Sequence, residues 1–128
     1  RLGGLVPARA PRLAKARQDR HAARINRVFD ACDVLLMPVI ARLPPHVLDL
    51  EGRGAVRTIL EQMRRYPFTG PWNALGQPAA AVPAGFTREG VPLSVQLLGR
   101  PNDEATLLSL AAQIEAERPW AERRPPIE

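Results

Sequence analysis

Apolar residues recur at intervals of three and four near the start of the chain, which is the spacing of one face of an α-helix. The repeating apolar positions are Ala22, Ile25, Phe29 and Cys32. Four arginines with the same spacing occupy the opposite side, namely Arg17, Arg20, Arg24 and Arg27. The pattern therefore predicts an amphipathic helix from about Ala10 to Ala31, with an apolar inner face and an arginine-rich outer face.

A continuous apolar run follows this helix. From Asp33 to Ile40 the chain shows no alternation of polar and apolar positions, which is typical of a strand that is buried on both faces. A helix followed by a buried strand is an α/β pattern. Residues 42–54 contain two adjacent prolines and two glycines and are predicted to be a loop, after which helical spacing returns between Gly54 and Tyr66.

Prolines and glycines interrupt the second half of the chain. Residues 67–78 contain three prolines and two glycines, so we expect a loop without regular structure whose apolar side chains pack inward. Residues 79–86 and 93–98 are predicted to be strands that form a hairpin. In the second strand, Leu97 and Leu98 are expected to face opposite sides of the sheet. A last helix is predicted to begin at Asn102 or Asp103 and to end before Pro119.

Composition and charge narrow the classes of function. The 128 residues carry a net charge of +5, and the sequence pI is near 10.9. Residues 1–30 contain eight basic and two acidic side chains, whereas residues 31–128 contain ten and eleven, so the excess positive charge lies in the segment of the first helix. The longest apolar run, Val34 to Ala41, is too short to cross a bilayer. A single cysteine excludes an internal disulfide.

The chain offers few groups for catalysis. Ser94 falls in a predicted strand and Ser109 in a predicted helix, and neither has the flanking glycines of a nucleophile elbow, so both are interpreted as packing residues. Lys15 is the only lysine in the sequence, and it lies on the exposed basic helix. The two histidines and the cysteine lack the spacing of zinc ligands, and no glycine-rich phosphate loop is present. The residues therefore indicate core and loop elements without a complete active site.

Three short motifs follow the apolar run in a fixed order. They are Asn73-x-x-Gly76-x-Pro78, Val82-Pro83-x-Gly85 and Pro92-x-x-Val95-Gln96-x-x-Gly99. Together with the run that ends near Pro38 and the helix from Asp103 to Glu117, this series resembles the C-terminal part of an amidase-signature enzyme. The resemblance covers nearly the whole chain and is most specific over residues 66–117.

The resemblance implies a fold and an activity. The fold would be α/β, with residues 1–128 forming the C-terminal segment of a single amidase domain and contributing part of a mixed central β-sheet flanked by helices. Members of the family hydrolyse carboxamides, or release ammonia from glutamine for tRNA-dependent amidation, through an acyl-serine intermediate. Their two serines and one lysine lie in a Gly-Ser-rich signature upstream of the matched region. That signature is absent here, so no catalytic residue is carried over.

The resemblance also implies that this segment supports the substrate pocket. Pro38, at the end of the buried strand, and Trp72 and Asn73, in the inward-packing loop, are expected to approach the acyl pocket; plain packing is the alternative for all three. The expected partners are a small-molecule amide and the N-terminal remainder of the domain, in the cytoplasm, without membrane, cofactor or metal. An initial Arg in place of Met indicates either processing or a piece of a longer protein. With the catalytic groups absent we expect a piece, and we expect that piece alone to be inactive.

Two other classes of function stay open at this point. The arginine-rich helix face is also compatible with a small nucleic-acid-binding module, although a solvated face is favoured because no aromatic residues suited to stacking lie beside the arginines. The second alternative is a non-catalytic interaction domain derived from an amidase. Its gene would lack the upstream catalytic region.

Overall fold

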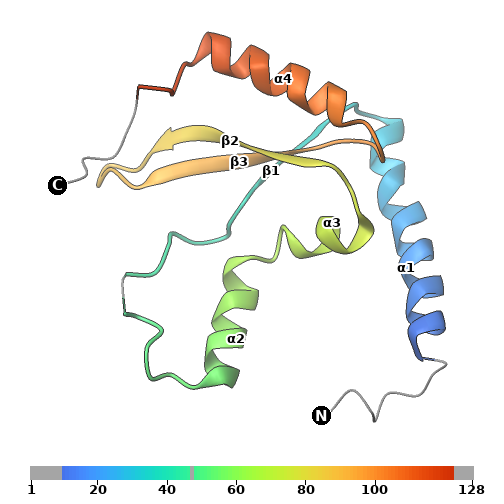
Figure 1. The fold of residues 1–128 in the computed structure, drawn as a ribbon, viewed down its shortest axis with the longest axis horizontal. Helices are drawn as coiled ribbons and strands as arrows, with labels where there is room; N and C mark the ends of the chain where they lie inside the picture. Colours follow the sequence, from blue (N-terminus) through green and yellow to red (C-terminus); the bar gives the residue numbers. More distant parts are fainter. Residues whose placement is uncertain (1–9, 47, 123–128) are drawn as a thin grey trace.

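The computed structural model describes residues 10–46 and 48–122, and a three-stranded antiparallel sheet lies at its centre (Figure 1). The strands are β1 (Leu35–Pro38), β2 (Ala79–Phe86) and β3 (Pro92–Leu98). The middle strand is β3, which pairs with β1 on one side and with β2 on the other. The predicted α/β class is confirmed, and all strand pairings among the described residues are antiparallel.

The predicted hairpin of β2 and β3 is confirmed. At the turn, the amide of Thr87 donates to the carbonyl of Val91 over 2.9 Å, and the Thr87 hydroxyl accepts bonds from the amides of Glu89 and Val91. A bulge between Pro83 and Gly85 shifts the register of β2 against β3. Gly85 has a φ of 115°, which a residue with a side chain rarely adopts. The bulge therefore accounts for the glycine of the second motif.

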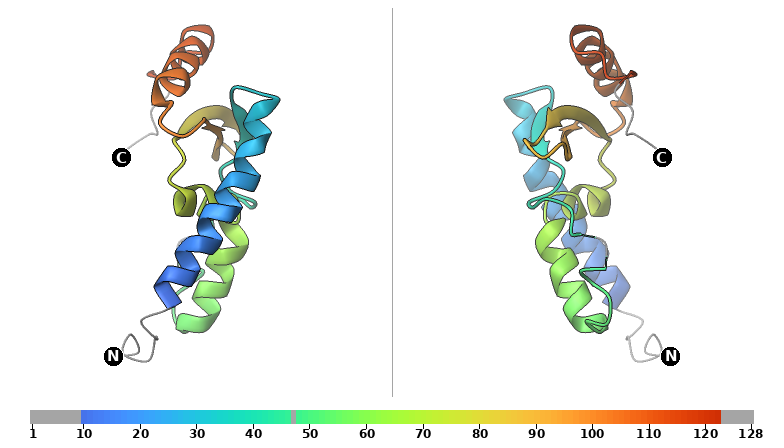
Figure 2. Two further views of the ribbon diagram at one scale, coloured as in Figure 1. Left: turned by 90° about the vertical axis from the view of Figure 1, so that its right-hand side faces the viewer. Right: turned by 90° about the vertical axis from the view of Figure 1, so that its left-hand side faces the viewer.

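Helix α4 (Glu104–Glu117) covers one face of the sheet (Figure 2). Its Leu107 is buried against Val82 and Leu97, and partly buried residues of the same helix surround this contact. Asp103 is the N-cap residue, as predicted, but its carboxylate accepts a bond of 2.8 Å from the Thr106 hydroxyl and none from a backbone amide. The predicted helix is confirmed.

The opposite face of the sheet is covered by α1 (Ala10–Asn26), by its 3₁₀ extension η2 (Arg27–Asp30), and by α3 (Gly70–Leu75). Phe29 and Trp72 pack here against Leu98. The apolar stripe predicted for the first helix faces this cluster, and the four arginines of the outer face are exposed. Neighbouring residues of β3 therefore serve two separate cores, because Leu97 and Leu98 are 2% and 0% exposed on opposite sides of the strand.

The prediction of a strand buried on both faces is wrong for the run from Asp33 to Ile40. The strand is only four residues long and lies at an edge of the sheet. Leu35 and Met37 are half-buried, whereas Leu36 is 62% exposed. An unbroken apolar run is typical of a strand with both faces buried. The run alone does not show whether other parts of the chain are present to cover both faces.

The prediction that residues 67–78 contain no regular element is also wrong. The short helix α3 begins just before Pro71, a position where proline is tolerated because the first amides of a helix have no intrahelical partner. Gly76 has a φ of 69° and ends the helix, and the amides of Gly76 and Gln77 bond back to the carbonyls of Asn73 and Trp72. The expected inward packing is confirmed by the burial of Trp72.

Helix α2 (Ala55–Arg65) lies apart from the sheet (Figure 1). Arg65 connects it to the preceding loop, because its carbonyl accepts from the amide of Ala41 over 2.9 Å and its guanidinium donates to the carbonyl of Leu43 over 2.8 Å. The helix agrees with the predicted one, but its large apolar residues are between 51% and 74% exposed; they are Val56, Ile59, Leu60 and Met63.

Candidate functional site

Pro38 ends the edge strand β1 and is itself exposed. Its Cα lies opposite that of Val95 in the ladder between β1 and β3. The carbonyl oxygen of Pro38 accepts a hydrogen bond of 3.0 Å from Nε2 of Gln96. The backbone at the end of the strand is therefore held by a side chain from the neighbouring strand.

Trp72 and Asn73 are adjacent on α3 but differ in environment. Trp72 is 8% exposed and belongs to the cluster with Phe29 and Leu98, whereas Asn73 is exposed. The amide of Asn73 donates to the carbonyl of Thr69 over 3.1 Å within the helix. In the described structure the Trp72 side chain thus belongs to the core, whereas the neighbouring Asn73 is exposed at the surface.

Gln96 belongs to the third sequence motif but was not predicted as a site residue. It lies on β3, is 5% exposed, and donates from Nε2 to two carbonyls, those of Pro38 at 3.0 Å and of Phe68 at 3.1 Å. Phe68 immediately precedes Thr69, the N-cap of α3. One buried amide therefore joins the end of β1 to the start of α3, which are the elements that carry Pro38 and Trp72. The signal in the sequence was an amide on the inward face of a predicted strand.

Gln77 is another buried amide that was not predicted. It is 9% exposed, and its Nε2 donates to Oδ1 of Asn26 at the end of α1. Its Oε1 is buried and has no hydrogen-bond partner among the described residues. Gln77 follows the glycine that ends α3, so this side chain connects α3 to α1.

The three groups considered for catalysis lie on three different elements. Ser94 is exposed on β3 and Ser109 is exposed on α4, and neither forms a side-chain hydrogen bond within residues 10–46 and 48–122. Lys15 forms an exposed ion pair of 3.2 Å with Asp19, one turn further along α1. The structure therefore brings no nucleophile and base together in its described part.

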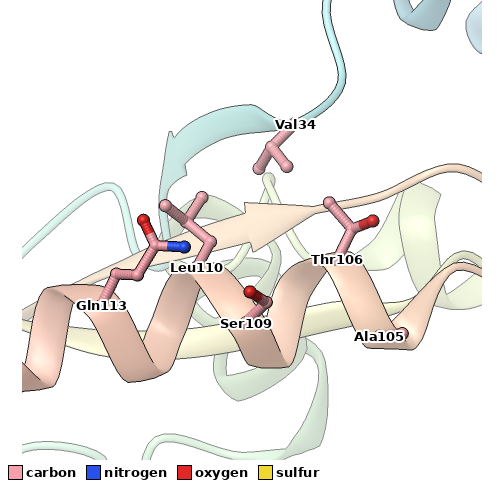
Figure 3. Close-up of a pocket in the computed structure, with 6 residues that line it drawn as sticks. All are labelled: Val34, Ala105, Thr106, Ser109, Leu110 and Gln113. Carbon is pink, nitrogen blue, oxygen red and sulfur yellow. The ribbon is translucent and has the colours of Figure 1, made fainter.

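A shallow groove of about 440 Å³ lies on the other face of the sheet, between α4 and the residue before β1 (Figure 3). Its lining residues are Val34, Ala105, Thr106, Ser109, Leu110 and Gln113. Val34 and Leu110 pack against the core under α4, whereas Trp72 packs on the opposite face of the sheet. The groove is thus separate from the end of β1 that Gln96 holds and from the core that contains Trp72.

Other kinds of site find little support in the described residues. No three His, Cys, Asp or Glu side chains there lie close enough together to hold a metal ion, and no helix there has the length and apolar character of a membrane span. The pKa of the Glu89 carboxyl is lowered by hydrogen bonds from the Thr87 side chain and from the backbone amide of Glu89 itself. This carboxylate lies in the hairpin turn, so its pKa shift concerns the turn and not the candidate site.

Comparison with known proteins identifies relatives over most of the chain. The family model described as Amidase matches residues 7–108. The protein AmiB2 of Mycobacterium tuberculosis, whose name places it among the amidases, is 47% identical over 127 residues, which are 99% of this chain and 28% of that protein. A 6-aminohexanoate-cyclic-dimer hydrolase of Paenarthrobacter ureafaciens is 34% identical over 116 residues, covering 84% of this chain and 23% of the hydrolase.

Solved structures agree with these matches. The structure of a 6-aminohexanoate cyclic dimer hydrolase superposes with a TM-score of 0.83 at 30% identity and covers 95% of this chain and 27% of that one. A glutamyl-tRNA(Gln) amidotransferase structure from Thermotoga maritima superposes with a TM-score of 0.64 at 26% identity, over 82% of this chain and 22% of the amidotransferase chain. The chain thus spans about a quarter of the length of these relatives. The matches give no support to the nucleic-acid-binding module.

Proposed function

The chain belongs to the amidase family, and we propose that it is the C-terminal segment of an enzyme that hydrolyses a carboxamide to a carboxylate and ammonia or an amine. The observation that carries this proposal is the agreement in both sequence and fold, because the match to an amide-related hydrolase structure extends over 95% of the chain. The share of the relatives that it spans, about 27%, supports a segment of one domain that is completed by further residues.

The proposed reaction proceeds through an acyl-serine intermediate whose catalytic groups come from outside this chain. The catalytic base takes the proton of the serine hydroxyl as its oxygen attacks the carbonyl carbon, the C–N bond breaks, and the base passes that proton to the leaving amine. Water then attacks the acyl-serine ester, which releases the carboxylate and restores the serine. The separation of Ser94, Ser109 and Lys15 in the structure supports this assignment of catalysis to the remainder of the protein.

Within this segment, we assign the walls of the acyl pocket to the region where β1 ends and α3 begins. Pro38 and Asn73 are exposed there. Trp72, next to Asn73 on α3, anchors that helix to the core. Exposed groups on rigid elements beside a buried aromatic anchor are suitable for contact with a ligand. The proposed partners are accordingly a small-molecule amide and the N-terminal remainder of the domain. We place the enzyme in the cytoplasm, an assignment with which the single half-buried thiol of Cys32 is compatible.

The test is an amidase assay on the full-length protein and on residues 1–128 alone. The full-length protein is expected to release ammonia or amine from at least one member of a panel that includes a simple aryl amide, a short aliphatic amide and 6-aminohexanoate cyclic dimer. The isolated chain is expected to release none, because it lacks a serine paired with a base. Turnover by the isolated chain, or a full-length protein inert toward every amide, would contradict the proposal.

A further inference from the structure

Gln96 occupies the central position of the sheet on the side of the proposed pocket. It is opposite Met37 of β1 and Ala81 of β2 in the two ladders. Its side chain extends on the same face as Leu98, the face covered by α1 and α3. A polar group at such a position loses its contact with water and must find hydrogen-bond partners inside the protein.

The partners of Gln96 come from two segments that are distant in sequence. Nε2 donates to the carbonyl of Pro38, 58 residues away, and to the carbonyl of Phe68, 28 residues away. A primary amide provides two N–H donors without charge. Neither a carboxylate nor an apolar side chain of the same length provides both donors, and asparagine is one methylene group shorter. The chemistry of this position therefore selects glutamine.

The same strand holds α3 at a second point. Leu98, two residues after Gln96, packs directly in the cluster that contains Trp72. Gln96 thus fixes the start of α3 through the Phe68 carbonyl, and Leu98 fixes its middle through the Trp72 side chain. Rotation or translation of α3 relative to the end of β1 requires both contacts to change.

We propose that Gln96 is a positioning residue for the substrate pocket, setting the separation between the end of β1 and the start of α3. The inference rests on the proposed function, since these two elements carry Pro38, Trp72 and Asn73. A substrate with a bulky acyl group touches both sides of such a pocket, whereas a small one does not reach both. Displacement of one side by a fraction of an ångström is therefore expected to lower kcat/KM mainly for bulky substrates.

The experiment measures kcat and KM of the full-length protein for a bulky aryl amide and for a short aliphatic amide. Gln96→Met removes both donors at nearly constant volume and is expected to lower kcat/KM about tenfold for the bulky amide, mostly through KM, and by less than about threefold for the short one. Gln96→Asn keeps an amide that does not span both carbonyls and is expected to fall between Met and wild type. Gln62→Met, at an exposed position of α2, is the matched control and leaves the ratio unchanged.

The two proposals fail in different ways. A full-length wild-type protein without amidase activity contradicts the proposed function itself. An active protein in which the Gln96 variants lower kcat/KM equally for both substrates contradicts the positioning role, because a purely structural residue affects the amount of folded enzyme and not its preference. If Gln96→Met does not fold, the substrate ratio of Gln96→Asn decides, and an unchanged ratio overturns the assignment.

Discussion

Leu98 connects the sheet to two distant parts of the chain. It has no exposed surface, and it packs against Phe29 from the end of the first helical segment and against Trp72 from α3. Removing most of a buried leucine side chain loses its transfer free energy and leaves a cavity that neighbouring groups fill only in part. The second core has no comparable contact with α1 or α3, and Leu98 is the sheet residue that is fully buried in the cluster with Phe29 and Trp72.

Leu98→Ala is therefore expected to destabilise the protein by about 2–5 kcal/mol. The measurement is the denaturant midpoint for unfolding of the core that contains Trp72, followed by tryptophan fluorescence of the 128-residue chain at low protein concentration, so that it does not require the whole chain to unfold as one unit. Leu108→Ala, at a position of α4 that is 68% exposed, is the control and should change stability by less than about 0.5 kcal/mol. Equal midpoints for the two variants would show that the Leu98 cluster does not stabilise the fold.

Single residues also mark the limit of prediction from sequence at the site. Pro38, Trp72 and Asn73 were proposed as site residues from the motif resemblance, which uses the order of residues along the chain, and they stay a prediction. The roles of Gln96, which stands in the third motif, and of Gln77 were not predicted, because they depend on hydrogen bonds to carbonyls or side chains between 28 and 58 residues away. Local patterns of polar and apolar positions carry no record of such partners.

At the scale of elements, α2 is the helix that packs least against the rest of the described chain. Its apolar residues lie on one helix face and are more than half exposed, and the described hydrogen bonds to the rest of the chain are those of Arg65. An amphipathic helix with an uncovered apolar face is stable only when it packs against another surface. We interpret this face as a surface that the proposed N-terminal remainder of the domain covers.

The double variant Ile59→Glu with Met63→Glu is expected to reduce self-association of the isolated 128-residue chain. The two carboxylates interrupt the apolar face, while α2 contributes no residue to either buried core cluster, so the fold of the sheet is expected to persist. Sedimentation velocity at several concentrations measures the change. Gln62→Glu introduces charge at an exposed, non-apolar position of the same helix and serves as the control. An unchanged association state in the double variant would exclude this face as the contact surface.

Elements with strong periodicity were predicted correctly, whereas those that depend on context were not. The amphipathic pattern of the first helix, the hairpin and α4 each carry their period in consecutive residues. The placement of β1 depends on which strand it pairs with, and α3 depends on the left-handed conformation of Gly76 that ends it. Proline and glycine counts indicate an interruption, but they do not exclude a helix of one and a half turns between two interruptions.

At the scale of the whole molecule, the three-stranded sheet has the features of one part of a larger sheet. Both outer strands, β1 and β2, have one edge without a partner among the described residues, and open edges favour pairing with other chains. Large apolar side chains are exposed on α2, α4 and β1. These features agree with a segment that spans about 27% of its structural relatives.

The isolated chain is accordingly expected to unfold over a broader temperature range than the full-length protein and to form oligomers as its concentration rises. The physical reason is that two small cores, covered on their outer sides by little further structure, do not unfold as one cooperative unit. Calorimetry of both proteins, with light scattering, checks this. A sharp transition of a monomer, with equal calorimetric and van't Hoff enthalpies, would show instead that residues 1–128 are an independent domain.

The pairing of β1 with β3 has a consequence for synthesis of the protein. The two strands are separated by roughly 60 residues, whereas β2 and β3 are joined by a single turn. At roughly 5–20 residues per second, β1 leaves the ribosome about 3–12 s before its partner. During that interval its apolar run is available to chaperones and to other nascent chains. The order of the strands along the chain therefore leaves the apolar run of β1 without its partner strand for several seconds of translation.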